Sequence, residues 1–382
     1  MILYISYATD SSIFNDLLNS GKIGSGNAVQ KFNDNIMRGL SQYEKLVSLA
    51  AVGYGNFAAE RIETDRNGIK YIVIKNRLGR LHKLWNVLYL WQEGERIIKK
   101  ERPRVIICDA IASSPNYVSK LLAWRFHIPL IGIVTDLPGT IAGGTNALAR
   151  SQSMRGFDAY ILLTEYMNDV VNPKNKPHIV VEGLCSPDIP SGRQSADNKK
   201  IIMYTGSIRK KLNGIENFIE GFLKANIPDC EFHLYGVGDL VSWVEKISET
   251  HPQIKYMGNV STDEIVDRQK WAELLVNPRP SDQEFCKYSF PSKTIEYMAS
   301  GVPVLMTRLP GVPIEYFDYV YVIENESSNG ISQKLKEIFS VSEESRYQFG
   351  LSARKFVLGK KSCSQQTKRI YDFSRTIEKV YM

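Results

Sequence analysis

The sequence predicts an α/β protein built from two doubly wound parallel-sheet domains. A chain of 382 residues is too long for one core and fits two domains of ordinary size. Short apolar runs typical of strands alternate with helical stretches along the chain, which favours parallel sheets covered by helices on both faces. Residues 183–199 are rich in Pro, Ser, Gly and polar side chains, so we expect a linker between a domain at 1–182 and a domain at 200–361.

The composition is that of a soluble globular protein, with 43% hydrophobic and 23% charged residues. No apolar run is long enough to span a bilayer, and the N-terminus lacks the basic region that precedes the apolar core of a signal peptide. We therefore expect a cytoplasmic protein. The five cysteines show no C-x-x-C spacing, so the sequence indicates neither a zinc site nor a disulfide framework. We expect most of them to be small buried hydrophobic residues.

The first domain begins with a buried-strand pattern at Ile2–Tyr7, and a helical run follows at about Ala28–Leu40. Between them lies a glycine loop that consists of Gly24, Ser25, Gly26 and Asn27. Glycines let a backbone approach a ligand closely, and the helix N-terminus behind them favours an anion. A plain flexible loop is the competing interpretation.

Further strand patterns in the first domain lie at Lys45–Ala51, Ile69–Ile74, Val105–Cys108, Leu130–Val134, Tyr160–Leu163 and Ile179–Val181. Ligands in such sheets bind beyond the carboxyl ends of the strands. The strand at Leu130–Val134 leads into Asp136, which is a candidate to accept a proton or a hydrogen bond from an acceptor hydroxyl. A turn-forming Asp ahead of Pro-Gly is the competing interpretation. Asp109, at another strand end, is a weaker candidate.

The net charge of +7 favours nucleic acid, a membrane surface or an anionic substrate as the partner. No zinc-finger spacing or RNA-binding aromatic signature supports nucleic acid. Residues 76–104 combine leucines and tryptophans at helical spacing with surrounding Arg and Lys, a pattern that suits docking onto an anionic bilayer. We favour a domain helix with a solvated charged face, because an ordinary core helix shows the same apolar spacing.

The second domain opens with an apolar strand pattern that ends at Gly206 and Ser207. A basic loop with Arg209, Lys210 and Lys211 follows and precedes a helix. A backbone that can approach a ligand, followed by cations, is suited to hold a diphosphate. A solvated turn is the competing interpretation.

More strands and a helix start are predicted in this domain. A strand pattern at Glu231–Gly238 ends in glycines that include Gly236, and other strands are expected at Ile254–Met257, Ala272–Asn277 and Tyr321–Ile323. Ser261 and Glu264 form a capping box that opens a helix. Beyond the last of these strands the chain becomes helical and charged.

Phe290–Leu305 carries the most specific signal in the chain. Pro291 cannot extend a strand, Ser292 can cap a short helix, and a glycine then ends that helix ahead of a buried strand. Ser292 and the free N–H groups at the helix start form a positive socket for phosphate or hydroxyl oxygens, and Lys293 adds a charge. Glu296 can accept hydrogen bonds from vicinal hydroxyls, as an acidic residue does for a nucleotide ribose. Together these two features suggest a nucleotide-sugar ligand.

The run FPSKTIEYMASGVPVL resembles the donor-binding segment of family 4 glycosyltransferases, also called group 1 glycosyltransferases, which have the GT-B fold. The resemblance covers nearly the whole chain and is strongest from Ile201 to Leu305. It implies two Rossmann-like domains that face a cleft, with a C-terminal helix at 362–382 that packs back on the first domain. It also implies that the donor contacts Tyr288, the loop from Gly206 to Lys211, Gly236, and the segment from Pro291 to Glu296.

Several positions depart from the family pattern. Tyr288 stands where the family usually has a Glu eight positions before the one that matches Glu296, and Thr135 stands where many members have a His. Ser207 and Asn213 occupy slots that commonly hold Arg and Lys. Arg209, Lys210 or Lys211 would therefore have to supply the positive charge that binds the diphosphate.

The resemblance implies a retaining glycosyltransferase of the hexosyltransferase type. It would move a sugar from a nucleotide-sugar, with a UDP-sugar favoured, to an acceptor hydroxyl on a lipid-linked or surface polysaccharide precursor. Such enzymes need no bound metal and no cofactor besides the donor substrate, because basic side chains and helix ends take the charge of the leaving diphosphate. No D-x-D motif is present, which agrees. The expected location is the cytoplasm, at the inner face of the cell membrane.

Two other functions stay open. A non-catalytic partner subunit of a glycosyltransferase complex would keep the fold without the chemistry, and Tyr288 and Thr135 favour it. A nucleotide-sugar epimerase is a second alternative, and its product, an isomerised sugar, would distinguish it.

Overall fold

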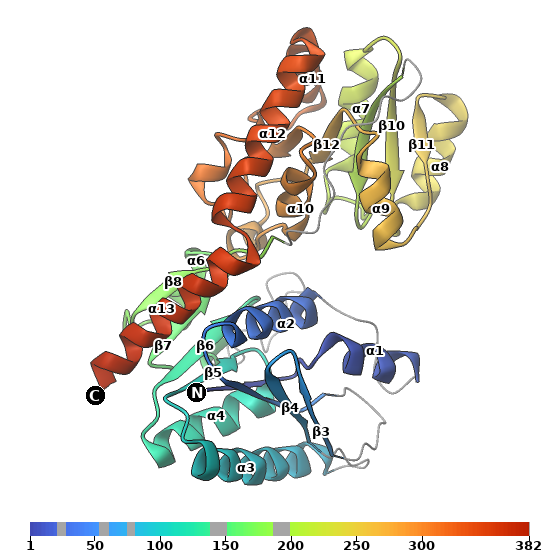
Figure 1. Ribbon diagram of the computed structural model, residues 1–382. Coiled ribbons are helices and arrows are strands. Elements are labelled where there is room, and N and C mark those ends of the chain that lie inside the picture. Colours follow the sequence, from blue (N-terminus) through green and yellow to red (C-terminus); the bar gives the residue numbers. More distant parts are fainter. Residues whose placement is uncertain (21–27, 53–60, 75–80, 138–150, 186–198, 382) are drawn as a thin grey trace. The chain divides into compact units, whose positions relative to one another are not determined.

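A computed structural model describes residues 1–20, 28–52, 61–74, 81–137, 151–185 and 199–381. The chain divides into two compact units (Figure 1). Unit 1 comprises residues 1–184 and 363–382, and unit 2 comprises residues 185–362. Each unit is an α/β layer structure around its own sheet.

Unit 1 contains a sheet of eight strands in the order β3-β4-β2-β1-β5-β6-β7-β8. All neighbours are parallel except β3 and β4, which form an antiparallel pair. The strands are β1 (Ile2–Ser6), β2 (Leu46–Ala50), β3 (Ile62–Arg66), β4 (Ile69–Val73), β5 (Val105–Asp109), β6 (Leu130–Val134), β7 (Ala159–Leu162) and β8 (His178–Val180). The predicted strands of this domain are confirmed. The prediction missed β3, because this edge strand has the polar sequence IETDR and no apolar run marks it.

Helices cover both faces of this sheet (Figure 1). On one face α2 (Ala28–Ser41) packs against α13 (Cys363–Tyr381), and on the other α3 (His82–Glu101) packs against α4 (Ser113–Phe126). Alternation along β1 explains the two layers, since Ile2 and Tyr4 join the core cluster that contains α2 and α13 residues, while the intervening side chains point the other way. Two further helices are α1 (Ser11–Asn19) and α6 (Tyr166–Val171).

The last helix, α13, is fixed to unit 1 by polar contacts from the body of that unit. Arg104 donates to the Ser374 hydroxyl at 3.0 Å and to the Ser374 carbonyl at 3.2 Å. The Gln366 amide donates to the Gly183 carbonyl at 3.2 Å. Because these partners lie far apart in the sequence, unit 1 is completed only when the end of the chain returns to it.

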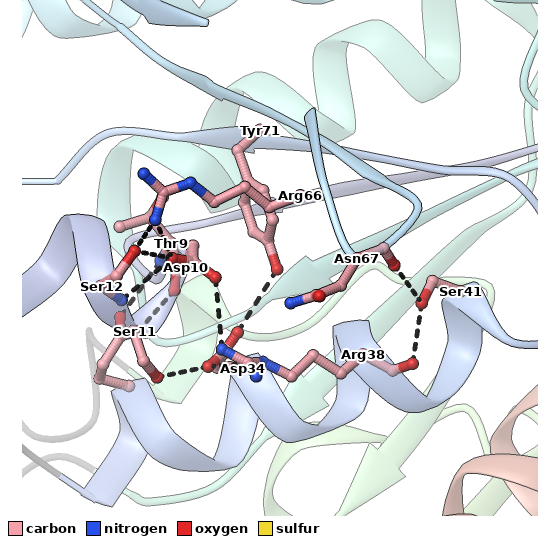
Figure 2. Close-up of polar contacts among 11 residues, drawn as sticks. Thr9, Asp10, Ser11, Ser12, Asp34, Arg38, Ser41, Arg66, Asn67 and Tyr71 are labelled. Carbon is pink, nitrogen blue, oxygen red and sulfur yellow. Dashed lines mark hydrogen bonds and ion pairs between the residues drawn. The ribbon is translucent and has the colours of Figure 1, made fainter. Parts of the chain in front are cut away.

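A polar cluster joins α1, α2 and β3 in unit 1 (Figure 2). Asp10, the N-cap of α1, and Asp34 on α2 are both buried. Arg38 reaches both carboxylates, at 3.3 Å from Asp10 and 3.1 Å from Asp34, and Arg66 lies 3.3 Å from Asp10. Burial by itself raises the pKa of Asp10, but the hydrogen bonds from Ser12 and the Arg38 charge outweigh it and hold the pKa below its ordinary value.

We predict that Asp10→Asn destabilises unit 1. The expected loss is about 1–3 kcal/mol, less than for a fully buried ion pair because the Arg38 and Arg66 side chains are partly exposed. The folded-state pKa of Asp10 is depressed, so its contribution is complete above the unfolded value near 3.8 and is lost as the pH falls through the folded value. Denaturant unfolding of both proteins should therefore show a gap at pH 7 that narrows in acid. Asp16→Asn, on the exposed side of α1, should match the parent protein throughout.

Unit 2 contains six parallel strands in the order β11-β10-β9-β12-β13-β14. They are β9 (Lys200–Thr205), β10 (Cys230–Tyr235), β11 (Ile254–Tyr256), β12 (Leu274–Asn277), β13 (Val304–Thr307) and β14 (Tyr321–Ile323). The α-helices are α7 (Ile215–Ala225), α8 (Val241–Thr250), α9 (Thr262–Gln269), α10 (Ser292–Ser300), α11 (Ser328–Ser340) and α12 (Glu343–Lys360). Helix α7 packs against α11, and α10 packs against α12 and α9. All predicted strands of this domain are confirmed.

The helix signals of unit 2 are confirmed with one correction. Ser261 caps α9 and accepts a hydrogen bond from the Glu264 N–H at 3.2 Å, and Gly301 ends α10 in a left-handed conformation with φ of 81°. The prediction that Ser292 caps α10 is wrong. Pro291 is the N-cap, and Ser292 is already the first helical residue, so its hydroxyl makes no capping hydrogen bond.

The prediction that most cysteines are buried is confirmed. Within the described residues all five are free, and Cys108, Cys185, Cys230 and Cys286 are buried. In the same part of the chain, no cluster of His, Cys, Asp and Glu side chains is arranged to hold a metal ion. No described helix combines the length and apolar character needed to cross a membrane.

Candidate functional site

The candidate site of unit 2 lies where β9 ends and α10 begins. Thr205 is the last residue of β9, and its hydroxyl accepts a hydrogen bond from the Lys293 ammonium at 3.2 Å. Tyr297, one turn further along α10, is fully buried, and its hydroxyl lies 2.8 Å from the same Thr205 hydroxyl. The Thr205 backbone N–H also donates to the Tyr297 hydroxyl at 2.9 Å. These contacts fix the start of α10 against the carboxyl end of the sheet.

Two glycines bring neighbouring loops into backbone contact at this edge. Gly206 and Gly236 have φ of 152° and 136°, and a Cβ on Gly236 would lie 1.7 Å from the Gly206 carbonyl oxygen. The Gly206 N–H donates to the Tyr235 carbonyl at 2.9 Å. Only glycine fits at position 236, because any side chain there would force the two loops apart. The role of Gly236 visible in the structure is therefore to shape the edge.

The loop after Gly206 is organised by its own polar residues. Asn213 accepts hydrogen bonds at 3.2 Å from the Ser207 hydroxyl and from the Arg209 backbone N–H. The side chains of Arg209, Lys210 and Lys211 are exposed, and none of them forms an ion pair within the described residues. The two positions that hold Arg and Lys in the resembled family thus hold a loop-forming pair in this chain, and the loop between them carries three exposed cations.

Arg279, which the sequence analysis did not single out, lies at the same edge. It follows β12 in the segment Pro278-Arg279-Pro280, and its guanidinium donates to the Ser289 hydroxyl at 3.3 Å and lies 5.5 Å from the centre of the Phe285 ring. Its Nε atom is buried and has no hydrogen-bond partner among the described residues. A motif search passes over this residue, because one Arg between two prolines carries no recognisable pattern.

Four of the predicted donor-binding residues belong to the approach to α10 and its first turns. Pro291 is buried, Ser292 is exposed, and Lys293 and Glu296 are half-buried. Burial lowers the pKa of Lys293, and the negative charge of Glu296 opposes that effect. Tyr288 is half-buried at the end of a 3₁₀ helix, Glu284–Tyr288, that leads into this segment.

In unit 1, Asp136 lies three residues beyond Ile133 of β6 and is exposed, and its carboxylate accepts a hydrogen bond from the Leu137 N–H at 2.8 Å. This local contact decides neither for the acceptor-binding interpretation of Asp136 nor for the turn-forming one. Asp109, at the end of β5, is buried, and burial raises its pKa to about 6. The glycine loop Gly24, Ser25, Gly26 and Asn27 lies outside the described residues.

We predict that Tyr297→Phe destabilises unit 2 and loosens α10. The change leaves the buried Thr205 N–H without its partner, which costs about 1–3 kcal/mol. Thermal and denaturant unfolding would measure the loss. Tyr319→Phe is the matched control, since the Tyr319 ring stacks on Phe356 and its hydroxyl makes no hydrogen bond within the described residues. Equal stability of the two variants would contradict the assigned role of Tyr297.

Comparison with solved structures identifies the class of fold. The chain is similar to sucrose-phosphate synthase from Thermosynechococcus elongatus, with a TM-score of 0.72, 12% identity and 100% coverage of both chains. It is similar to a glycosyltransferase from Rickettsia africae, with a TM-score of 0.65, 14% identity and 98% coverage of both. It is also similar to Anabaena HepE in complex with UDP-glucose, with a TM-score of 0.62, 11% identity and coverage of 98% and 99%. The fold is therefore GT-B, as the sequence predicted.

Sequence comparison finds a family model that matches one part of the chain. Residues 199–340 match the family model described as "Glycosyl transferases group 1", and this range contains the whole candidate site of unit 2. The resemblance stated from the sequence is confirmed by this match. A search of curated protein sequences finds no significant match.

Proposed function

We propose that this protein is a retaining glycosyltransferase of the hexosyltransferase type, which moves a sugar from a nucleotide-sugar to an acceptor hydroxyl. The observation that carries the proposal is that the family match, residues 199–340, coincides with an edge of unit 2 where glycines, a helix start and cations converge. Helix starts and cations suit an anionic leaving group. A UDP-sugar is the favoured donor, because HepE, which has the same fold, has been solved with UDP-glucose bound.

In this proposal different residues of α10 bind different parts of the donor. Ser292 and the backbone N–H groups at the helix start bind phosphate oxygens, and Glu296 binds the ribose hydroxyls one turn further on. Tyr288 and Pro291 border the donor, and the basic loop after Gly206 supplies mobile positive charge. Asp136 accepts a hydrogen bond or a proton from the acceptor hydroxyl. The donor is a substrate, and no further cofactor or metal takes part.

We predict that Glu296→Ala weakens binding of the preferred nucleoside diphosphate by about 10-fold or more, because the ribose loses two charge-assisted hydrogen bonds. Isothermal titration with UDP, GDP, dTDP and ADP would first identify the base and then compare the variant. Glu284→Ala is the control, since Glu284 is exposed and pairs with Lys287. Unchanged affinity in the Glu296 variant would contradict the placement of the ribose.

Activity is tested with the sugar donors of the preferred base. Slow release of free sugar, with its anomeric configuration retained on first appearance in an NMR spectrum, is the expected result. An isomerised sugar would instead identify an epimerase. Selective nucleotide binding without turnover, even with lipid-linked acceptors, would favour the non-catalytic subunit. Tyr288 in place of the family's Glu and Thr135 in place of its His support that alternative. The Thr135 hydroxyl is buried and has no hydrogen-bond partner among the described residues.

The acceptor we propose is a lipid-linked or surface polysaccharide precursor at the inner face of the cell membrane. The support comes from unit 1, where three large apolar side chains of α3 and α4 are exposed. Leu84 and Leu88 on α3 are 63% and 39% exposed, and Trp124 on α4 is 76% exposed. Helix α3 also buries Leu90, Ile97 and Ile98, as a domain helix does, and its exposed leucines are the part of it that supports a membrane contact. Arg125 beside Trp124 adds a positive charge suited to anionic lipid.

We predict that Leu84→Glu/Leu88→Glu reduces the fraction of protein that sediments with phosphatidylglycerol vesicles several-fold, because these apolar side chains would otherwise enter the bilayer interface. The control is Val341→Glu/Val380→Glu, which makes the same change of charge at exposed positions elsewhere on the chain. If both double variants lose vesicle binding equally, the change in net charge causes the loss, and Leu84 and Leu88 do not contact the membrane.

A further inference from the structure

Arg279 and Lys293 are two cations that the fold holds in place by hydrogen bonds, although the charge of Glu296 also acts on Lys293. Within the described residues neither forms an ion pair, and their polar contacts are to hydroxyl groups, those of Ser289 and Thr205. Two buried cations of the same unit do bond to a carboxylate. Arg346 bonds to Glu273, and Lys361 bonds to Glu315. Arg279 and Lys293 differ from these two cations, because hydroxyl groups hold them and no ion pair with a carboxylate neutralises them within the described residues.

Both cations lie around the same short stretch of backbone. A Cβ on Gly206 would meet the Tyr204 hydroxyl at 3.1 Å and the Lys293 Cε atom at 3.4 Å, so Lys293 and Tyr204 flank Gly206. Arg279 is close enough to Tyr204 for its positive charge to act on that hydroxyl. The glycine, the arginine and the lysine thus belong to one surface at the carboxyl ends of β9 and β12.

Arg279 is also more rigid than the cations of the basic loop. Its guanidinium is held by the Ser289 hydroxyl and by the Phe285 ring, and prolines precede and follow it. A fixed guanidinium loses little side-chain entropy when it binds an oxyanion, whereas an exposed Arg or Lys must first be ordered. Its buried Nε, which lacks a protein partner, is a donor that an anion or the water bound to it can satisfy.

From this arrangement we infer that Arg279 and Lys293 together form the fixed binding site for the diphosphate of the donor. They take the role that the sequence analysis gave to Arg209, Lys210 and Lys211, which would act only as an outer, mobile layer. The identity of the ligand as a nucleoside diphosphate rests on the proposed function. The existence of an anion site at Arg279 and Lys293 does not, and inorganic pyrophosphate can probe it separately.

The test compares Arg279→Gln with the loop variant Arg209→Gln/Lys210→Gln/Lys211→Gln by isothermal titration. We expect Arg279→Gln to weaken binding of pyrophosphate and of the preferred nucleoside diphosphate by about 10-fold or more, and the loop variant to weaken both by only a few-fold. Arg279→Lys should restore part of the loss. Binding of the corresponding nucleoside should change little in Arg279→Gln, because the nucleoside has no phosphate. Arg308→Gln is the control, since Arg308 is exposed and already paired with Glu324.

A second readout separates binding from folding. Because Arg279 has no counter-charge in the ligand-free protein, Arg279→Gln should unfold at the same temperature as the parent protein or higher. An unfolding temperature well below that of the parent would assign Arg279 a structural role and overturn the inference. So would wild-type affinity for pyrophosphate in Arg279→Gln, or no pyrophosphate binding by the parent protein. Pyrophosphate binding with no preference among nucleotides would support the anion site and contradict the proposed function.

Discussion

The hydrogen bonds between Tyr297 and Thr205 are the interaction on which the candidate site depends. They join the end of β9 to α10 in the buried interior of unit 2, and they use both the backbone and the side chain of Thr205. Since α10 also carries Lys293 and Glu296, fixing this helix fixes the charges that face the edge of the sheet. Because its side chains are already ordered, such a site can bind a charged group without the entropy cost of ordering those side chains on binding.

The two glycines and the cations are the other features of the site that suit a bound diphosphate. Glycines at positions 206 and 236 remove side chains from two loops that lie in backbone contact, so no side chain of these two residues stands between the backbone and a ligand at this edge. Cations that form no ion pair within the described residues then provide the charge that a diphosphate needs. Partly buried cations that form no ion pair contribute little to stability, so ligand binding explains two of them at one edge better than folding does.

The sequence predicted the strands well, because in a doubly wound sheet most strands are buried on both sides and appear as apolar runs. It predicted α10 and its glycine stop from local chemistry, but it placed the cap at Ser292 instead of Pro291, since both residues are compatible with a helix start. The edge strand β3 was missed because its residues are largely polar. Tyr297 was missed because its role comes from contacts with Thr205, which is distant in the sequence. Arg279 was missed because its contacts with Phe285 and Ser289 depend on how the irregular segment after β12 folds, which no local pattern encodes.

A crystal structure of the protein with its preferred nucleoside diphosphate would test the account most directly. The account predicts phosphate oxygens within hydrogen-bonding distance of the Arg279 guanidinium and the Lys293 ammonium, next to Gly206, with the ribose hydroxyls on the Glu296 carboxylate. A diphosphate bound only by Arg209, Lys210 and Lys211, with Arg279 still bonded to Ser289 alone, would contradict the assignment of the fixed cations. A nucleotide bound away from α10 would contradict the site itself.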